Sequence, residues 1–190
     1  GKGACVRQGM LAAGGRYRVF TDADLSYPLD QLPKLLGALE AGAGVAVASR
    51  EASSVRYQAP ARRLVTLASR FVMHTFFVPG VPDTQAGFKA FTAEVADDLF
   101  GVQRLTGFGF DVELLHVAHL RGYRIVPLAV EWRDVPGTRV RLVRDVLRGG
   151  RELVLLVLNR LLGRYAQRPL ATEAQAAIPQ APQPAPVSEG

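Results

Sequence analysis

Two carboxylates, Asp22 and Asp24, follow directly after the short apolar run YRVF. That run predicts a β-strand over 17–21, so both acids would stand at the carboxyl end of a strand, where open α/β sheets bind their ligands. Mg²⁺ takes one or two protein carboxylates and completes its shell with phosphate oxygens and water. We therefore predict a divalent-metal site, for Mg²⁺ or Mn²⁺, at these two residues; an exposed acidic turn is the alternative.

Several basic residues could bind phosphate near that site. Arg50 follows a second predicted strand, 45–48, and would lie on the same edge of the sheet. Arg62 and Arg63 begin a helical pattern, where a bound anion is favoured by the helix dipole. Lys2 lies between two glycines just before a helix. Each of these charges could equally be a solvated surface group.

Two further segments are dense in polar groups. DTQAGFK contains Asp83, Gln85 and Lys89, and GFDVELL contains Asp111 and Glu113 at a predicted helix start. Acids in a first helical turn commonly do no more than complement the helix dipole. Two such segments beside an Asp-x-Asp pair nevertheless favour a functional site.

The elements that must position these residues alternate in pattern. Helical patterns cover 4–13, 29–41, 61–77, 93–100 and 110–121, and strand patterns cover 17–21, 45–48, 87–91 and 123–132. This alternation predicts an α/β layered fold with a mostly parallel sheet.

The net charge of +6 is concentrated near the end of the chain. Residues 133–168 hold nine arginines against three acids, and a helical pattern over 140–164, with a potential break at Gly149–Gly150, carries most of them. Arginines 141, 144, 148 and 151 share one helical face, which predicts a basic amphipathic helix. It could pack on the core or lie on an anionic membrane. The Pro-rich segment 167–190 is predicted to be a disordered tail.

Composition excludes several classes of protein. A chain of 190 residues is long enough for one domain, and its single cysteine excludes a disulfide framework. The longest apolar run, Leu153–Leu158, is too short to cross a bilayer. The arginine stripe has no interleaved aromatic residues, so we expect no nucleic-acid partner.

The three histidines show no ligand spacing and are interpreted as structural: His74, His116 and His119.

Taken in order, these motifs resemble those of the family 2 glycosyltransferases that act on polyprenyl phosphates. The dolichyl-phosphate β-glucosyltransferase branch is the most similar, and the dolichyl-phosphate mannose synthases are close relatives. The motifs that carry the resemblance are GKGACVRQGM, FTDADLSYP, ASR, ARRL, DTQAGFK, GFDVELL and VEWRDVPGTRV, which together span about residues 1–145.

The resemblance implies a GT-A fold and inverting transfer of glucose or mannose from a UDP- or GDP-linked donor to a polyprenyl phosphate. It implies that Asp22 and Asp24 bind the metal. The residues that it places at the substrate phosphates are Lys2, Arg50, Arg62, Arg63 and Arg139. The residues that it places near the sugar and the acceptor, as catalytic groups, are Asp83, Gln85, Lys89, Asp111 and Glu113.

The proposed chemistry is consistent with the residue types. A phosphoryl acceptor has a second pKa of about 6, so it is largely ionised at neutral pH and needs no strong general base. A lipid acceptor would also explain the basic helix, because basic residues contribute about 1 kcal/mol each near anionic lipid. We expect a peripheral enzyme on the cytoplasmic face of a membrane, with a glycosyltransferase domain at 1–137, a membrane-associating helix at 138–166 and the tail at 167–190.

The sequence also departs from the family. Members normally open with a strand and a Pro-x-Tyr-Asn-Glu-like segment, whereas this chain begins inside the helix that follows. We therefore expect the sheet to lack its first strands and the isolated chain to be a poor enzyme. Ser26 stands where some mannose synthases have a further metal ligand. The alternatives are an inactive fragment, or an aspartate-nucleophile phosphatase in which Lys89 and the pair Asp97–Asp98 supply the later motifs.

Overall fold

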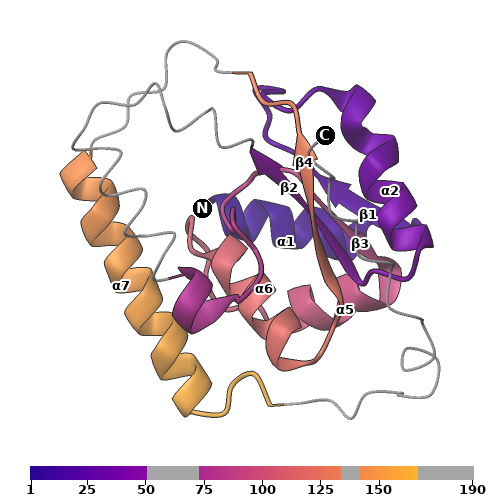
Figure 1. Ribbon diagram of the computed structural model, residues 1–190. Helices are drawn as coiled ribbons and strands as arrows, with labels where there is room; N and C mark the ends of the chain where they lie inside the picture. Colours follow the sequence, from indigo (N-terminus) through magenta and orange to yellow (C-terminus); the bar gives the residue numbers. More distant parts are fainter. Residues whose placement is uncertain (51–72, 134–141, 167–190) are drawn as a thin grey trace, which may run out of the picture.

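The computed structural model describes residues 1–50, 73–133 and 142–166 (Figure 1). Several predicted features lie outside the described residues, namely Arg62, Arg63, Arg139, Arg141, most of the 61–77 helix and the 167–190 tail.

Four strands form one sheet within the described residues, in the order β1-β3-β2-β4. They are β1 (Tyr17–Phe20), β2 (Val45–Arg50), β3 (Lys89–Thr92) and β4 (Ile125–Val130). β2 pairs with β4 in parallel, and β3 runs antiparallel to both β1 and β2. The predicted α/β fold is confirmed. The sheet was predicted to be mostly parallel, but it is mixed: among the four described strands, β3 runs antiparallel to the other three.

The sheet divides the interior into two apolar layers. In β2, the side chains of Val45 and Val47 join one buried cluster, and those of Ala46 and Ala48 join the other. This alternation follows from the two-residue period of a strand. Because both faces are buried, β2 reads as a continuous apolar run.

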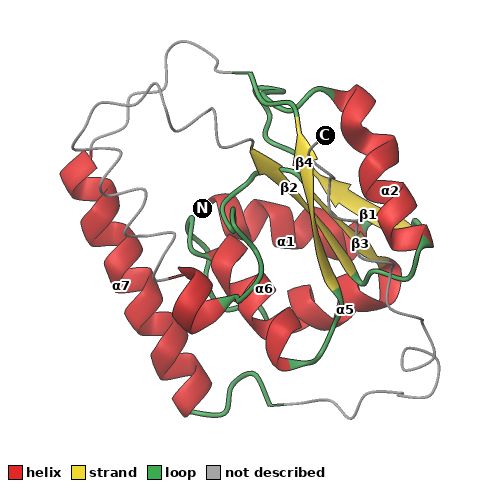
Figure 2. Ribbon diagram, in the orientation of Figure 1, coloured by secondary structure: helices red, strands yellow, loops and turns green. Residues whose placement is uncertain are grey.

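Helices cover both faces of the sheet (Figure 2). One face packs against α2 (Leu32–Glu40), which follows a short 3₁₀ turn, η1 (Leu29–Gln31). The other packs against α1 (Lys2–Ala12), α5 (Ala93–Val102) and α6 (Phe110–Leu120). The layer beneath α2 is rich in alanine, whereas the opposite layer is filled by Val, Leu and Phe side chains.

Most predicted elements agree with the structure to within a few residues. The exceptions have local causes. Strand β3 begins at Lys89 and not at Gly87, because the DTQAGFK segment before it forms a loop. Thr92 ends β3 and also caps α5, since its hydroxyl accepts a hydrogen bond from the Val95 amide at 3.4 Å. Of the predicted 61–77 helix, the described part is a short π-helical turn, η2 (Met73–Phe77).

The last helix, α7 (Leu142–Leu161), runs without a break through Gly149–Gly150. It lies on the opposite side of the molecule from α2 (Figure 1). Leu156 and Asn159 are buried against the rest of the protein, whereas Arg148 and Arg151 are exposed. No helix in the described ranges has the length and hydropathy needed to cross a membrane.

Candidate functional site

A tight turn after β1 holds the two predicted metal ligands. The amide of Leu25 donates to the Asp22 carbonyl at 3.1 Å, and the amide of Ser26 donates to Oδ1 of Asp24 at 3.0 Å. Leu25 has a φ of 51°, in the left-handed region that non-glycine residues rarely adopt. Such backbone strain is found preferentially at functional sites. The turn places Asp22 half-buried and Asp24 exposed, two residues apart.

Asp22 is held from two sides. Nζ of Lys2 lies 2.5 Å from its Oδ1, and each side chain is 29% exposed. Gly87, in the DTQAGFK loop, packs directly on the carboxylate, and a Cβ at that position would overlap the carboxylate oxygens. Glycine is therefore required at 87 for Asp22 to keep this position.

Arg50, at the end of β2, forms a two-point contact with Asp83. Its Nε and Nη2 donate to the two carboxylate oxygens at 2.6 and 3.0 Å, and its guanidinium lies 5.7 Å from the centre of the Trp132 ring. Burial lowers the pKa of Arg50, but the hydrogen bonds and charge of Asp83 outweigh it and raise this pKa above its usual value. Asp83 therefore fixes the arginine in one orientation and keeps it charged.

Tyr27 connects this pair with Asp22. Burial raises the pKa of its hydroxyl; Arg50 lowers it, and the carboxylates of Asp83 and Asp22 raise it further. Its ring packs on Phe88, with centroids 5.8 Å apart. Tyr27 is thus a buried, neutral side chain near both Asp22 and the Arg50–Asp83 pair.

Lys89 and Asp111 form a buried ion pair beneath the site. Nζ of Lys89 lies 2.5 Å from Oδ1 of Asp111 and donates to the Ala86 carbonyl at 2.6 Å, and the lysine side chain has no exposed surface. Burial raises the pKa of Asp111, while the charges of Lys89 and Lys2 oppose this change. The pair is too enclosed to contact a large substrate directly, and it joins β3 to the start of α6.

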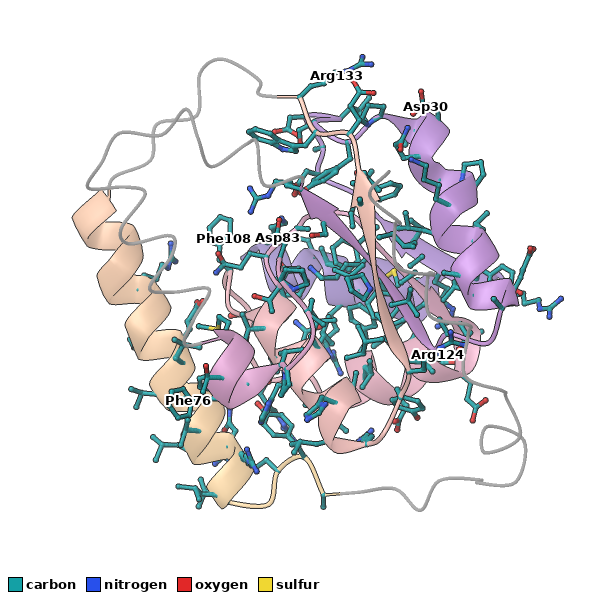
Figure 3. The ribbon with its side chains drawn as sticks, in the orientation of Figure 1. Asp30, Phe76, Asp83, Phe108, Arg124 and Arg133 are labelled. Atoms are coloured by element: carbon teal, nitrogen blue, oxygen red, sulfur yellow. The ribbon has the colours of Figure 1, made fainter. Side chains whose placement is uncertain are left out.

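The structure thus brings together three ion pairs, Lys2–Asp22, Arg50–Asp83 and Lys89–Asp111. Within the described part of the chain, no ion pair engages Asp24. Asp24 is exposed, so a cation can reach its carboxylate, and the two half-buried basic side chains, Lys2 and Arg50, can face a bound anion. Phe108, which is 60% exposed, projects from the ribbon near the Lys2 side of this group (Figure 3).

Two predicted site residues are arranged differently. Gln85 is exposed on the DTQAGFK loop. Glu113 is fully buried; its carboxylate accepts hydrogen bonds from the amides of Arg104 and Leu105, at 2.9 and 2.8 Å, and from the Tyr165 hydroxyl. Residues two apart on a helix face different directions, which separates Glu113 from Asp111. Glu113 holds the 104–105 loop, and a catalytic role for it stays a prediction.

Three residues at the site were not predicted from the sequence: Tyr27, Gly87 and Trp132. Gly87 and Trp132 lie in motifs identified from the sequence, but neither side chain is charged or nucleophilic, so neither was predicted as a site residue. Tyr27 follows the Asp-x-Asp turn directly, and only the packing on Phe88 shows that it faces inward.

An α/β sheet with an acidic turn at a strand end and basic side chains beside it is an arrangement suited to binding a cation together with an anion. The comparisons identify the family. The sequence model of glycosyl transferase family 2 matches residues 1–100, which is more than half of the chain. The chain therefore belongs to glycosyl transferase family 2.

Curated relatives are similar over most of this chain. The dolichyl-phosphate beta-glucosyltransferase of Drosophila melanogaster is 33% identical over 174 residues, covering 87% of this chain and 53% of the relative. The enzymes of the same name from Saccharomyces cerevisiae and Homo sapiens are each 30% identical, covering 87% of this chain and 54% of their own length. The chain thus spans about half the length of the curated relatives it matches.

Solved structures support the fold. Glucosyl-3-phosphoglycerate synthase from Mycobacterium tuberculosis, in complex with uridine diphosphate, matches with a TM-score of 0.56 at 23% identity, covering 84% of this chain and 55% of that one. The same enzyme with Mn²⁺, UDP-glucose and glycerol 3-phosphate matches with a TM-score of 0.53 at 21% identity and the same coverage. The predicted GT-A fold is confirmed by this likeness.

Gly87→Ala should displace the Asp22 carboxylate, because the new Cβ would occupy its place. We expect Mn²⁺ affinity, measured by titration calorimetry, to fall about tenfold while the circular dichroism spectrum is kept. Gly101→Ala is the matched control, since a Cβ added there would have nothing within 4 Å. Equal Mn²⁺ affinity in the two variants would show that Gly87 does not hold Asp22 in place.

Glu113→Ala should destabilise the protein by about 2–4 kcal/mol, because buried amides at 104 and 105 lose their acceptor. Urea unfolding measures this change directly. Glu94→Ala, at an exposed position on α5, should change the unfolding free energy far less. If Glu113→Ala abolished sugar transfer at unchanged stability, the carboxylate would be catalytic and our structural interpretation wrong.

Proposed function

We propose that this protein transfers glucose from UDP-glucose to a polyprenyl phosphate of the dolichyl type, with inversion at the anomeric carbon. The observation that carries the proposal is the Asp22–Asp24 turn, in which Asp22 pairs with Lys2, together with Arg50, which Asp83 holds nearby. All of these residues lie inside the region matched by the glycosyl transferase family 2 model. The names of the 30–33% identical relatives support glucose and the lipid acceptor. The complexes of the Mycobacterium tuberculosis enzyme support UDP as the nucleotide.

Mg²⁺ or Mn²⁺ fits the residues present at the end of β1. Asp22 and Asp24 offer hard oxygen ligands. The ion pair between the Lys2 ammonium and Asp22 shows that a positive charge can approach this carboxylate. No group of three His, Cys, Asp or Glu side chains that could hold a metal occurs among the described residues, so diphosphate oxygens and water would complete the shell. When bound, the metal supplies Lewis-acid neutralisation of the leaving diphosphate.

The chain's own residues then position the two substrates. Lys2 and Arg50 bind the donor diphosphate, with Arg62, Arg63 and Arg139 as further proposed phosphate contacts. An oxygen of the acceptor phosphate attacks C1 of glucose and forms the new C–O bond. The bond from C1 to the β-phosphate oxygen breaks, and its electron pair leaves with UDP. The acceptor is already ionised, so positioning supplies much of the rate.

The remaining predicted residues support this arrangement. Asp83 orients Arg50, and the buried pair of Lys89 and Asp111 supports the floor of the site. Gln85, exposed on the loop before β3, is proposed to contact the sugar or the acceptor. Glu113 holds the adjacent 104–105 loop in place.

A phosphatase mechanism is disfavoured by the position of Asp97 and Asp98. Both lie on α5, where Asp97 pairs with Arg18 at 2.6 Å and Asp98 pairs with Arg121 at 2.5 Å. Neither stands at a strand end beside Asp22. The later acidic motif of that class is therefore absent from this segment.

The product assay tests the proposal directly. Incubation with UDP-glucose, Mn²⁺ and short-chain polyprenyl phosphate should yield β-linked polyprenyl phosphoglucose and UDP, detected by mass spectrometry and by NMR of the anomeric proton. Asp24→Asn should lower turnover by about 100-fold or more, the loss expected when one essential electrostatic group is removed. Asp30→Asn, an exposed carboxylate on η1, is the control. Absence of product from the wild-type protein would favour the inactive alternative.

We further propose that α7 attaches the protein to the membrane that carries its acceptor, on the cytoplasmic face, as a segment (138–166) distinct from the glycosyltransferase domain (1–137). The 154–162 apolar stripe is exposed along α7 and at the residue that follows it, and its members recur at helical spacing. It consists of Val154, Val157, Leu158, Leu161 and Leu162. Arg151, Arg160 and Arg164 are exposed along its flanks. An apolar stripe bordered by arginines suits the interface of an anionic bilayer.

Binding to vesicles separates the two contributions. Leu158→Ser with Leu161→Ser should weaken binding to every vesicle, because the buried apolar area is lost. Arg148→Glu with Arg151→Glu should weaken binding to anionic vesicles alone, and this effect should diminish as salt increases. Lys34→Glu, on α2 at the opposite side of the molecule, is the charge control. If wild-type protein sedimented with neither vesicle type, α7 would not be a membrane-binding element.

A further inference from the structure

Glu152 is the only acid among the side chains described on α7, and it points inward. Its Oε2 accepts a hydrogen bond from the Gly109 amide at 2.5 Å, and a Cβ at Gly107 or Gly109 would overlap its side chain. Gly109 is the residue that precedes α6, so the carboxylate stands at the positive end of that helix. The contact therefore fixes the loop at 103–109 to α7.

The opposite side of the same loop touches the start of the chain. The amide side chain of Gln103 donates to the Gly3 carbonyl at 3.0 Å, and a Cβ at Gly1 would overlap the Thr106 carbonyl. Gly3 packs against the Cβ of Phe110. Nothing larger than glycine fits at either position, so a shift of the loop must also shift the first turn of α1.

Lys2 lies between those two glycines. Its Nζ is 6.0 Å from the ring centres of both Phe108 and Phe110, and 2.5 Å from Oδ1 of Asp22. The rings of Phe108 and Phe110 therefore lie beside the Lys2 ammonium. The position of the 103–109 loop therefore sets the position of Lys2 relative to the Asp22 carboxylate.

We propose that Glu152 is a positioning residue for the donor site: through the 103–109 loop it places Lys2 where Lys2 can meet the donor diphosphate. The inference rests on the proposed function, in which Lys2 binds that diphosphate. It assigns a role to α7 beyond membrane attachment. The residue acts through Phe108 and Phe110 and does not itself touch the substrate.

Hydrogen–deuterium exchange of the protein without ligand tests the link itself. Glu152→Ala should increase exchange at the amides of residues 106–110 and also at residues 3–5. Leu155→Ala shortens another side chain that α7 packs against the core, about one turn further along the helix, and should leave both segments unchanged. Unchanged exchange at 3–5 in Glu152→Ala would overturn the proposal, whether or not the protein transfers sugar.

Calorimetric titration of Mn²⁺–UDP then tests the consequence. Glu152→Ala should weaken this affinity about tenfold, the lower range for outer-shell positioning groups. Glu152→Gln should restore most of it, because its Oε1 can still accept from Gly109, and Leu155→Ala should have no effect. In a Lys2→Ala background, Glu152→Ala should cause no further loss, since residues acting through one another are non-additive.

The outcomes distinguish the two proposals. Fully additive losses from Lys2→Ala and Glu152→Ala would contradict a role through Lys2. Equal losses from Glu152→Ala and Leu155→Ala would show that Glu152 only packs α7 against the core. If wild-type protein bound no Mn²⁺–UDP while the exchange pattern held, the proposed function would fail, and the link between α7 and Lys2 would stand.

Discussion

Lys89 has no exposed surface, so its ammonium must find every partner inside the protein. An unpaired buried charge is prohibitively unfavourable, and breaking a buried pair costs about 3–5 kcal/mol. Its two partners come from different segments, the Ala86 carbonyl from the loop and the Asp111 carboxylate from α6, and its ammonium lies 5.6 Å from the centre of the Phe20 ring on β1. This one requirement joins the elements that carry the site. Through these contacts the lysine joins the loop that carries Gly87 to α6 and packs beside β1, which leads into the Asp22 turn.

The fold and the acidic turn could be predicted because they depend on local pattern. YRVF and VAVAS read as strands from their apolar runs, and Asp22 and Asp24 follow the first of them directly. The reversed direction of β3 could not be predicted, since strand direction depends on the path of a long connection between 50 and 89. The sequence also left open whether α7 continues through Gly149–Gly150, because glycine disfavours a helix. The tertiary contacts of Leu156 and Glu152 stabilise the continuous helix.

Predicting the site from sequence was harder, because the pairing of charges is a tertiary property. The sequence marked Lys2, Asp83 and Lys89 as polar residues in suggestive segments, but it could not show which acid each basic group would meet. Glu113 shows the limit most clearly. Its neighbour in the motif, Asp111, pairs with Lys89 beneath the site, whereas Glu113 accepts hydrogen bonds from two backbone amides of an adjacent loop. Residue type and spacing alone do not distinguish these two structural roles.

The central claim is that Asp22 and Asp24 hold a divalent metal against the phosphates of the nucleotide donor. Pulsed electron–nuclear double resonance on Mn²⁺ measures this contact directly, because a phosphorus nucleus bound through oxygen couples to the electron spin. With protein and UDP present, the account predicts a ³¹P coupling on protein-bound Mn²⁺ that is lost from the protein-bound species in Asp22→Asn with Asp24→Asn. Protein-bound Mn²⁺ without ³¹P coupling, or a coupling that persists on the double variant, would contradict it.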